Sequence, residues 1–149
     1  HGSAAAAIEA LVAAEVAARP TAQQRLWIAS ALGDTADAAR ALQAGAKIDS
    51  LDPQGNRRAL NYAALNDRDD VISLLLSRGA SINLANRTGF TPLHHAVEGS
   101  AHAALRRLIA AGADLSLKNS AGRTALEYAR LRGDNVAVQL LEAAGRRTE

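Results

Sequence analysis

The adjacent histidines His94 and His95 are the residues of this sequence best suited to acid–base or metal chemistry. Histidine changes its charge near neutral pH, and its ring nitrogens are common zinc ligands. Neighbouring side chains on a helix point about 100° apart, however, so this pair cannot easily hold one metal ion. With four histidines and no cysteine in the chain, the usual zinc ligand sets are largely missing and a thiol nucleophile is excluded. We therefore expect no metal site here.

A cluster of three aspartates, Asp67, Asp69 and Asp70, could suggest a calcium site. Calcium loops also need a following glycine and a glutamate at fixed spacing, and neither is present. The cluster stands between two predicted helices, where carboxylates accept hydrogen bonds from the free N–H groups that open a helix, so helix capping is favoured. The sequence lacks the phosphate-binding loop, the serine nucleophile elbow and the zinc-protease helix. We predict no catalytic residue, no cofactor and no enzyme activity.

The composition is typical of one globular unit with a core of small and aliphatic side chains. The chain has 149 residues, of which 48% are apolar and 21% charged. Aromatic residues make up only 3%, too few for platforms on which nucleic-acid bases stack. The interior must therefore be built from Leu, Ile, Val and many Ala.

The charge pattern argues against two classes of partner. The formal net charge is +2, and all basic residues except Lys47 and Lys118 are arginines. Because carboxylates are mixed among these arginines, the sequence does not predict a nucleic-acid surface. Residues 4–19 do not predict a membrane span, because they are fewer than about 20 and include Glu9 and Glu15.

The Ala- and Arg-rich composition suggests a bacterial source. The high isoelectric point of about 9.5, the lack of Cys and the missing initiator Met favour a periplasmic over a cytoplasmic location.

An internal repeat of 33 or 34 residues runs along the chain. The run GFTPLHHA at residues 89–96 is echoed 33 residues later by GRTALEYA at residues 122–129. A second marker keeps the same period: Gly-Ala pairs stand at residues 45–46, 79–80 and 112–113, followed by Gly145. Two independent markers with one period indicate a repeat architecture.

Each period predicts two helices and a connecting hairpin. Thr91 followed by Pro92 is typical of a helix start, with a capping hydroxyl before a proline at the first helical position. A polar break follows, and then an apolar stripe at residues 71–76 in one copy predicts a second helix. Left-handed caps, which need no Cβ, are expected at Gly79, Gly112 and Gly145. The predicted fold class is all-α.

These residues resemble the ankyrin repeat, whose signature G-x-T-P-L-H-x-A is followed by a helix and then G-A-D-x-N. The resemblance is strongest over residues 86–118 and implies a solenoid of about four repeats, at residues 20–52, 53–85, 86–118 and 119–149. The second repeat has one more residue between Gly55 and Leu60 than the third has between Gly89 and Leu93, so we expect a longer hairpin tip there.

The resemblance also implies roles for single residues and for the whole chain. His94 occupies the position of the ankyrin histidine that bonds neighbouring turns, and Trp27, which stands at the same position of the first repeat, is expected to pack. The implied function is a non-catalytic adaptor, inhibitor or regulator that binds another protein. The alternative is a regulatory or accessory domain of a larger enzyme assembly.

The ends of the array are expected to differ from its middle, because terminal repeats meet water. Arg130 and Glu142 replace apolar residues of the preceding copies, so we expect the array to end at residue 144 with a frayed tail behind it. Residues 1–3 look like a tag remnant. Residues 4–19 are expected to form a capping helix, with an apolar stripe at Ile8, Leu11, Val12 and Val16. The chain alone is expected to be monomeric.

The resemblance places the partner-binding surface on the hairpin tips and the first helix of each repeat. The predicted contact residues are Asn56, Arg57, Leu65, Arg87, Phe90, Glu98, Arg123, Leu131 and Arg132. Phe90, the sole phenylalanine, stands in a turn where we expect it to be exposed as a hot spot. The many arginines favour a partner with an acidic surface.

Overall fold

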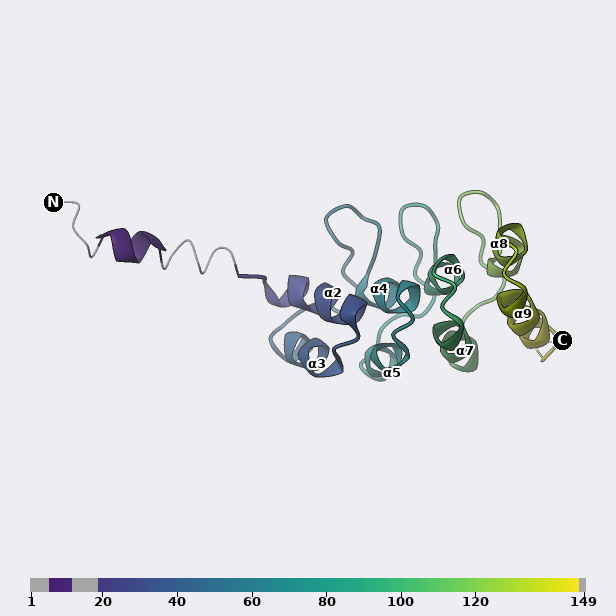
Figure 1. Ribbon diagram of the computed structural model, residues 1–149, viewed down its shortest axis with the longest axis horizontal. Helices are drawn as coiled ribbons and strands as arrows, with labels where there is room; N and C mark the ends of the chain where they lie inside the picture. The colour runs from purple at the N-terminus through teal and green to yellow at the C-terminus, as the bar shows by residue number, and fades with distance from the viewer. Residues whose placement is uncertain (1–5, 12–18, 148–149) are drawn as a thin grey trace.

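The computed structural model describes residues 6–11 and 19–147. Helices α2 to α9 form four pairs, which stack side by side with their hairpin loops projecting to the same side (Figure 1). Residues 6–11 are helical. The helices of the four pairs are α2 (Ala22–Leu32), α3 (Thr35–Gln43), α4 (Ala59–Leu65), α5 (Asp69–Ser77), α6 (Pro92–Glu98), α7 (His102–Ala110), α8 (Ala125–Arg132) and α9 (Asn135–Arg147). No strand occurs in the described ranges, so the predicted all-α solenoid is confirmed.

The first helix of each pair begins at a repeated polar position. The hydroxyls of Thr21, Thr91 and Thr124 each accept the backbone N–H three residues on, at 3.1, 3.4 and 3.2 Å. Arg58 stands at this position in the second repeat, and its own N–H donates to Asn61 Oδ1 at 2.8 Å. The helix start is therefore bonded even in the copy that has lost its Thr-Pro pair.

A backbone hydrogen bond of 2.9 Å joins the two ends of each hairpin tip. The donors and acceptors are Asp52 N–H to Arg57 O, Asn86 N–H to Phe90 O, and Asn119 N–H to Arg123 O. The first of these encloses one more residue than the other two, which confirms the longer tip of the second repeat. At Gly89, with φ 76°, a Cβ atom would lie 2.7 Å from Ser120 N of the next tip. The hairpin tips of the third and fourth repeats therefore pack too closely for a side chain at Gly89.

The core lies between successive helix pairs and is built from leucine and alanine. Leu75, Leu93, Leu108 and Leu141 are all buried in this core. Alanine is buried at one equivalent position in every repeat, at Ala29, Ala63, Ala96 and Ala129. These small residues let neighbouring helices approach closely.

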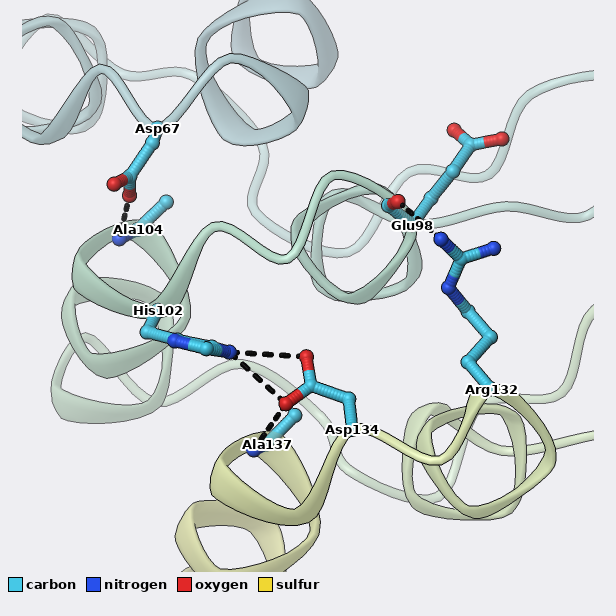
Figure 2. Close-up of polar contacts among 7 residues, drawn as sticks. All are labelled: Asp67, Glu98, His102, Ala104, Arg132, Asp134 and Ala137. Carbon is cyan, nitrogen blue, oxygen red and sulfur yellow. Dashed lines mark hydrogen bonds and ion pairs between the residues drawn. The ribbon is translucent and has the colours of Figure 1, made fainter.

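Carboxylates link neighbouring repeats on the side of the second helices (Figure 2). Asp67 Oδ1 accepts the N–H of Ala104 in α7 at 2.9 Å, so this residue caps the helix of the following repeat. Its own helix α5 begins after Arg68, which makes no side-chain cap, while Asp69 and Asp70 lie in the first turn. Capping is thus confirmed for Asp67, where the backbone φ is 60°, but the capped helix belongs to the following repeat.

The C-terminal end of the array is polar, as expected. Arg130 is exposed and its Nη2 lies 4.0 Å from Glu142 Oε2. The prediction of a left-handed cap at Gly145 is wrong, because α9 continues through this residue to Arg147. Gly79 and Gly112 have φ of 93° and 88° where the chain turns into a hairpin. Gly145 is followed instead by two arginines, which favour helix and interact well with its C-terminal end.

At the other end, Ile8 and Leu11 are 59% and 70% exposed. Val12 and Val16 of the expected stripe lie outside the described residues, and the capping role of residues 4–19 stays a prediction. Trp27 packs partly buried against the core, and its Nε1–H donates to Ser50 O at 3.1 Å. The packing role expected for this residue is confirmed for its own repeat.

Candidate functional site

Four of the nine predicted contact residues surround one hollow. Asn56, Arg57, Phe90 and Glu98 line a cavity of about 310 Å³ between the tips of the second and third repeats. The hollow is completed by Asn86, Thr88 and His95. The tips supply its polar rim, and α6 supplies Glu98 and His95. The repeat thus brings together residues that are more than thirty positions apart in the sequence.

Phe90 forms the apolar wall of this hollow. Its ring centroid lies 5.5 Å from that of His94 and 5.3 Å from those of His95 and Tyr128. The side chain is therefore half-buried, and the expectation that Phe90 is exposed is wrong. These rings belong to α6 and α8, and within the turn Asn86 Oδ1 accepts the N–H of Phe90 at 2.9 Å.

Arg57 is held over an aromatic ring. Its guanidinium carbon lies 5.7 Å from the ring centroid of Tyr62. The Tyr62 hydroxyl donates to Asp52 Oδ2 at 2.7 Å, and burial together with this carboxylate raises the pKa of Tyr62 to about 12. The ring is therefore neutral and fixed, so Arg57 has a rigid apolar surface to lie against.

Two charged groups of the hollow contain buried atoms without a partner. Arg57 Nε and Glu98 Oε1 are both shielded from water and make no hydrogen bond with the described residues. Unpaired buried polar atoms are costly, and charged groups cost the most. A bound molecule that offered these atoms a partner after a small side-chain movement would remove this cost.

His94 joins the third repeat to the fourth. The N–H of Thr91 approaches Nδ1 at 3.3 Å, so Nε2 carries the ring proton and donates to Arg123 O at 2.9 Å. Burial lowers the pKa of His94 more than the bond to Arg123 raises it. The linking role implied by the resemblance is confirmed.

His95 is 2% exposed, and its Nδ1 donates to Thr91 O at 3.2 Å. Burial lowers its pKa to about 4, assisted by the positive charge of Arg57. His95 is therefore neutral at pH 7 and serves the packing of Phe90. Each histidine thus bonds a backbone carbonyl, His94 through Nε2 and His95 through Nδ1.

Comparison with known proteins agrees with this geometry. The family model described as ankyrin repeats (3 copies) matches residues 26–119 and 60–147. The chain belongs to the ankyrin repeat family. It is also 41% identical over 56 residues to an ankyrin repeat protein of fowlpox virus (strain NVSL). This match covers 38% of the present chain and 16% of the viral protein. Since this relative is viral, a bacterial source stays a prediction.

The ankyrin repeats place a second arginine over a second tyrosine. The guanidinium carbon of Arg132 lies 5.6 Å from the ring centroid of Tyr128, and its Nη2 donates to the backbone oxygen of Glu98 at 2.9 Å (Figure 2). Leu131 beside it is 62% exposed. Both arginines thus lie over tyrosine rings, Arg57 from a hairpin tip and Arg132 from the end of α8.

The predicted residues Leu65, Arg87 and Arg123 do not line the hollow. Arg87 is exposed, while Leu65 and Arg123 are half-buried. Sequence reasoning missed Tyr62 and Tyr128, the two rings that hold the arginines. The repeat period could have revealed them, because Tyr62, His95 and Tyr128 occupy the same position in successive repeats.

The described residues show no group of three or more His, Asp or Glu side chains that could hold a metal ion. Within the same part of the chain, no helix has the length and hydropathy needed to cross a membrane.

Proposed function

We propose that this chain is a non-catalytic adaptor, inhibitor or regulator that docks a partner protein on its tips and on α4, α6 and α8. Ankyrin repeats are generally modules of protein–protein interaction. The observation that supports this proposal is the hollow lined by Arg57, Phe90 and Glu98, which combines an aromatic wall with charged groups whose buried atoms Nε and Oε1 have no hydrogen-bond partner among the described residues. Aromatic and arginine side chains dominate the binding energy of many protein interfaces.

The tips are organised before any partner arrives. Arg87 N–H donates to Gly55 O at 3.3 Å, and Ser120 N–H donates to Thr88 O at 3.0 Å, so each tip is bonded to its neighbour. Asn86 Nδ2 adds a third link, to Asn56 O at 2.6 Å. Binding to a surface that is already ordered loses little conformational entropy, which favours affinity.

The charge of this face favours an acidic partner. Arg57, Arg87, Arg123 and Arg132 all lie on it, whereas Glu98 is its one carboxylate among the predicted contact residues. Arg57 and Arg132 are supported by tyrosine rings, so they are held ready to pair with carboxylates. The partner we propose presents Asp and Glu side chains toward these arginines.

Affinity capture from lysate with paired variants tests the proposal. We expect R87E/R132E to lose the proteins that the parent retains, because both side chains are exposed on the proposed face. R106E/R146E makes the same charge change at exposed positions outside that face and should retain them. Thermal melting of both variants checks that the repeats remain folded. Equal retention by the two variants would contradict the proposed face.

The same capture separates a protein partner from nucleic acid. Treatment of the lysate with nuclease should leave the retained proteins in place. Release of everything by nuclease, with retention that falls steeply as salt rises, would indicate phosphate contacts instead.

A further inference from the structure

An apolar groove of about 600 Å³ lies between the first helices of the first and second repeats. Helix α2 supplies Trp27, Ile28, Ala31 and Leu32 to its lining, and α4 supplies Tyr62. Ile28 is 50% exposed and Leu32 is 66% exposed, so the groove is open to water. An open apolar surface of this kind marks a place where another protein packs, whereas small-molecule sites enclose most of their ligand.

The groove lies on the face that we propose for partner binding. One position of the first helix recurs on this face in successive repeats, as Ile28, Tyr62, His95 and Tyr128. Tyr62 lines the groove, and Arg57 lies over its ring and lines the neighbouring hollow together with His95. The groove and the hollow therefore meet at Tyr62 and Arg57.

The outer end of the first repeat is a separate, polar surface. Arg25 Nη2 donates to the carboxylate of Asp37, and Arg40 Nε lies 3.4 Å from Oδ1 of the same carboxylate. These three residues do not line the groove. The groove is therefore an apolar part of the face of the first helices and not a gap at the end of the stack.

The two rings of the groove are held in place by hydrogen bonds. Trp27 Nε1–H donates to Ser50 O at 3.1 Å, and the Tyr62 hydroxyl donates to Asp52 Oδ2 at 2.7 Å. The surface is thus formed before a partner arrives, and little side-chain entropy is lost when it is covered.

The direction of the groove favours a helical occupant. Trp27 and Ala31 are one helical turn apart, and so are Ile28 and Leu32, which means that the groove follows the axis of α2. A helix laid along it meets the groove with apolar side chains three or four residues apart. An extended segment would need a free strand edge for its backbone bonds, and the described residues contain no strand.

The charge at the Tyr62 end of the groove is positive. The guanidinium carbon of Arg57 lies 5.7 Å from the centroid of this ring, and Nε has no hydrogen-bond partner among the described residues. The nearby carboxylate of Asp52 is 6% exposed and accepts bonds from the Tyr62 hydroxyl and from the N–H of Asn56. A partner therefore meets Arg57 here and not Asp52.

The opposite end of the groove does not favour an acidic partner. Leu32 also borders a smaller hollow that is lined by Arg68 and by three aspartates, Asp67, Asp69 and Asp70. Carboxylates outnumber the one arginine there. The carboxylates of a partner are therefore favoured at the Arg57 end alone.

We propose that the partner presents an amphipathic helix whose large apolar side chains pack on Trp27, Ile28 and Leu32. Acidic residues at one end of this helix reach Arg57. The proposal rests on the proposed function, because it names the segment that the partner lays on the same face. Tryptophan and arginine are the side chains that most often dominate the energy of such contacts.

Selection from a random peptide library tests the chemistry of the occupant. The probe is a library of peptides of about 16 residues, or roughly four helical turns, displayed on phage and selected on the full chain. We expect the enriched peptides to carry large apolar residues at spacings of three and four, with Asp or Glu gathered at one end. Enrichment of basic peptides, of peptides without this spacing, or of none would overturn the proposal.

Trp27 is the only tryptophan of the chain and lines the groove, so its fluorescence reports directly on binding there. An enriched peptide without tryptophan should shift the Trp27 emission to the blue and protect it from acrylamide quenching. A version of this peptide with a central proline should bind more weakly, because proline breaks the helix. Equal binding of the two peptides would overturn the helical occupant.

Paired variants locate the apolar contact. I28D/L32D should weaken peptide binding by at least about tenfold, because the apolar contacts of two side chains are lost. L84D/V136D makes the same kind of change at exposed positions that do not line the groove, and it should bind as the parent does. Thermal melting checks that both variants are folded. Unchanged binding by I28D/L32D would overturn the proposal.

A charge exchange locates the acidic end. R57E should bind the acidic peptide about tenfold more weakly than the parent does. A peptide whose acidic residues are replaced by lysine should bind R57E more tightly than it binds the parent, a gain that damage to the fold cannot produce. If R57E prefers the same peptide as the parent, the acidic end does not reach Arg57.

Failure of this inference and failure of the proposed function give different results. If I28D/L32D retains the proteins captured from lysate while R87E/R132E loses them, the face is used without the groove and only this inference is overturned. Equal retention by R87E/R132E and R106E/R146E contradicts the face itself. In sedimentation, a parent dimer that I28D/L32D dissociates would mean that a second copy occupies the groove, and it would overturn the partner helix.

Discussion

His102 Nε2 in α7 lies 3.0 Å from both carboxylate oxygens of Asp134, the residue that precedes α9. The same carboxylate accepts the N–H of Ala137 at 3.1 Å and so caps α9 (Figure 2). Asp67 and Ala104 make a comparable junction between the second and third repeats. Each of these carboxylates caps the second helix of a repeat and also links two neighbouring repeats. The start of the helix and the alignment of the two repeats therefore depend on the same side chain.

Replacing Asp134 with Ala should lower the free energy of unfolding by about 1–2 kcal/mol, since it removes a helix cap together with the link to His102. Asp134→Asn keeps an acceptor for the Ala137 N–H and should cost less. Urea unfolding followed by circular dichroism measures both. Asp70→Ala, at an exposed position of α5, is the control and should stay within about 0.5 kcal/mol of the parent. A loss in D70A as large as that in D134A would contradict the assigned cap.

The stability of the fold should fall as the pH drops from about 6.5 to about 4. Burial lowers the pKa of His95 to about 4, and burial also lowers that of His94. In this range the unfolded chain binds more protons than the folded chain, so protonation favours unfolding. The pKa shift of His95 corresponds to roughly 3 kcal/mol, which is fully present only above the ordinary histidine pKa.

The free energy of unfolding, measured by urea titration at several pH values, tests this expectation. His95→Gln removes the titrating group, so its stability should depend less steeply on pH than that of the parent, whatever its absolute stability. His102→Gln is the control, because His102 is only partly buried and binds a carboxylate. An unchanged slope in H95Q would show that His95 is not the group responsible.

The sequence and the structure agree where the deciding contact is local and disagree where it is not. The starts of α6 and α8 follow from Thr91 and Thr124, whose hydroxyls bond within the first helical turn. The longer hairpin tip of the second repeat follows from the position of Gly55. Asp67 could not be assigned to α7 from the sequence, because its partner Ala104 is 37 residues away. The residue type of Asp67 indicated that it caps a helix, but not which helix it caps.

Phe90 shows the same limit within the candidate site. Its turn position suggested exposure, and only the stacking of repeats brings Tyr128 to within 5.3 Å of its ring. The family register was sufficient to place Asn56, Arg57, Phe90 and Glu98 on one face. It did not show that Tyr62 and Tyr128 support the arginines, because those contacts depend on side-chain direction as well as on repeat position.

Truncation of Leu108 to Ala should cost about 2–5 kcal/mol, because this side chain is fully buried between helix pairs. Leu131→Ala makes the same chemical change at a position that is 62% exposed, and it should cost less than about 0.5 kcal/mol. Urea unfolding of the two variants beside the parent gives both values. Similar costs at the two positions would mean that Leu108 does not lie in the core.

The polar C-terminal face should keep this end of the stack from self-association. Arg130 and Glu142 occupy positions that are apolar in the preceding repeats, where Ala64 and Val97 are buried. Burying either charge unpaired beneath another protein layer would cost several kcal/mol. The double variant R130V/E142L replaces the ion pair with a contiguous apolar surface of the kind that drives association. We expect this variant to elute earlier in size-exclusion chromatography as its concentration rises, while the parent does not associate through this end.

R87L/R106V adds the same two apolar residues at exposed positions on separate elements and should elute as the parent does. If R130V/E142L also elutes as the parent does at every concentration, the polar face does not prevent association at this end.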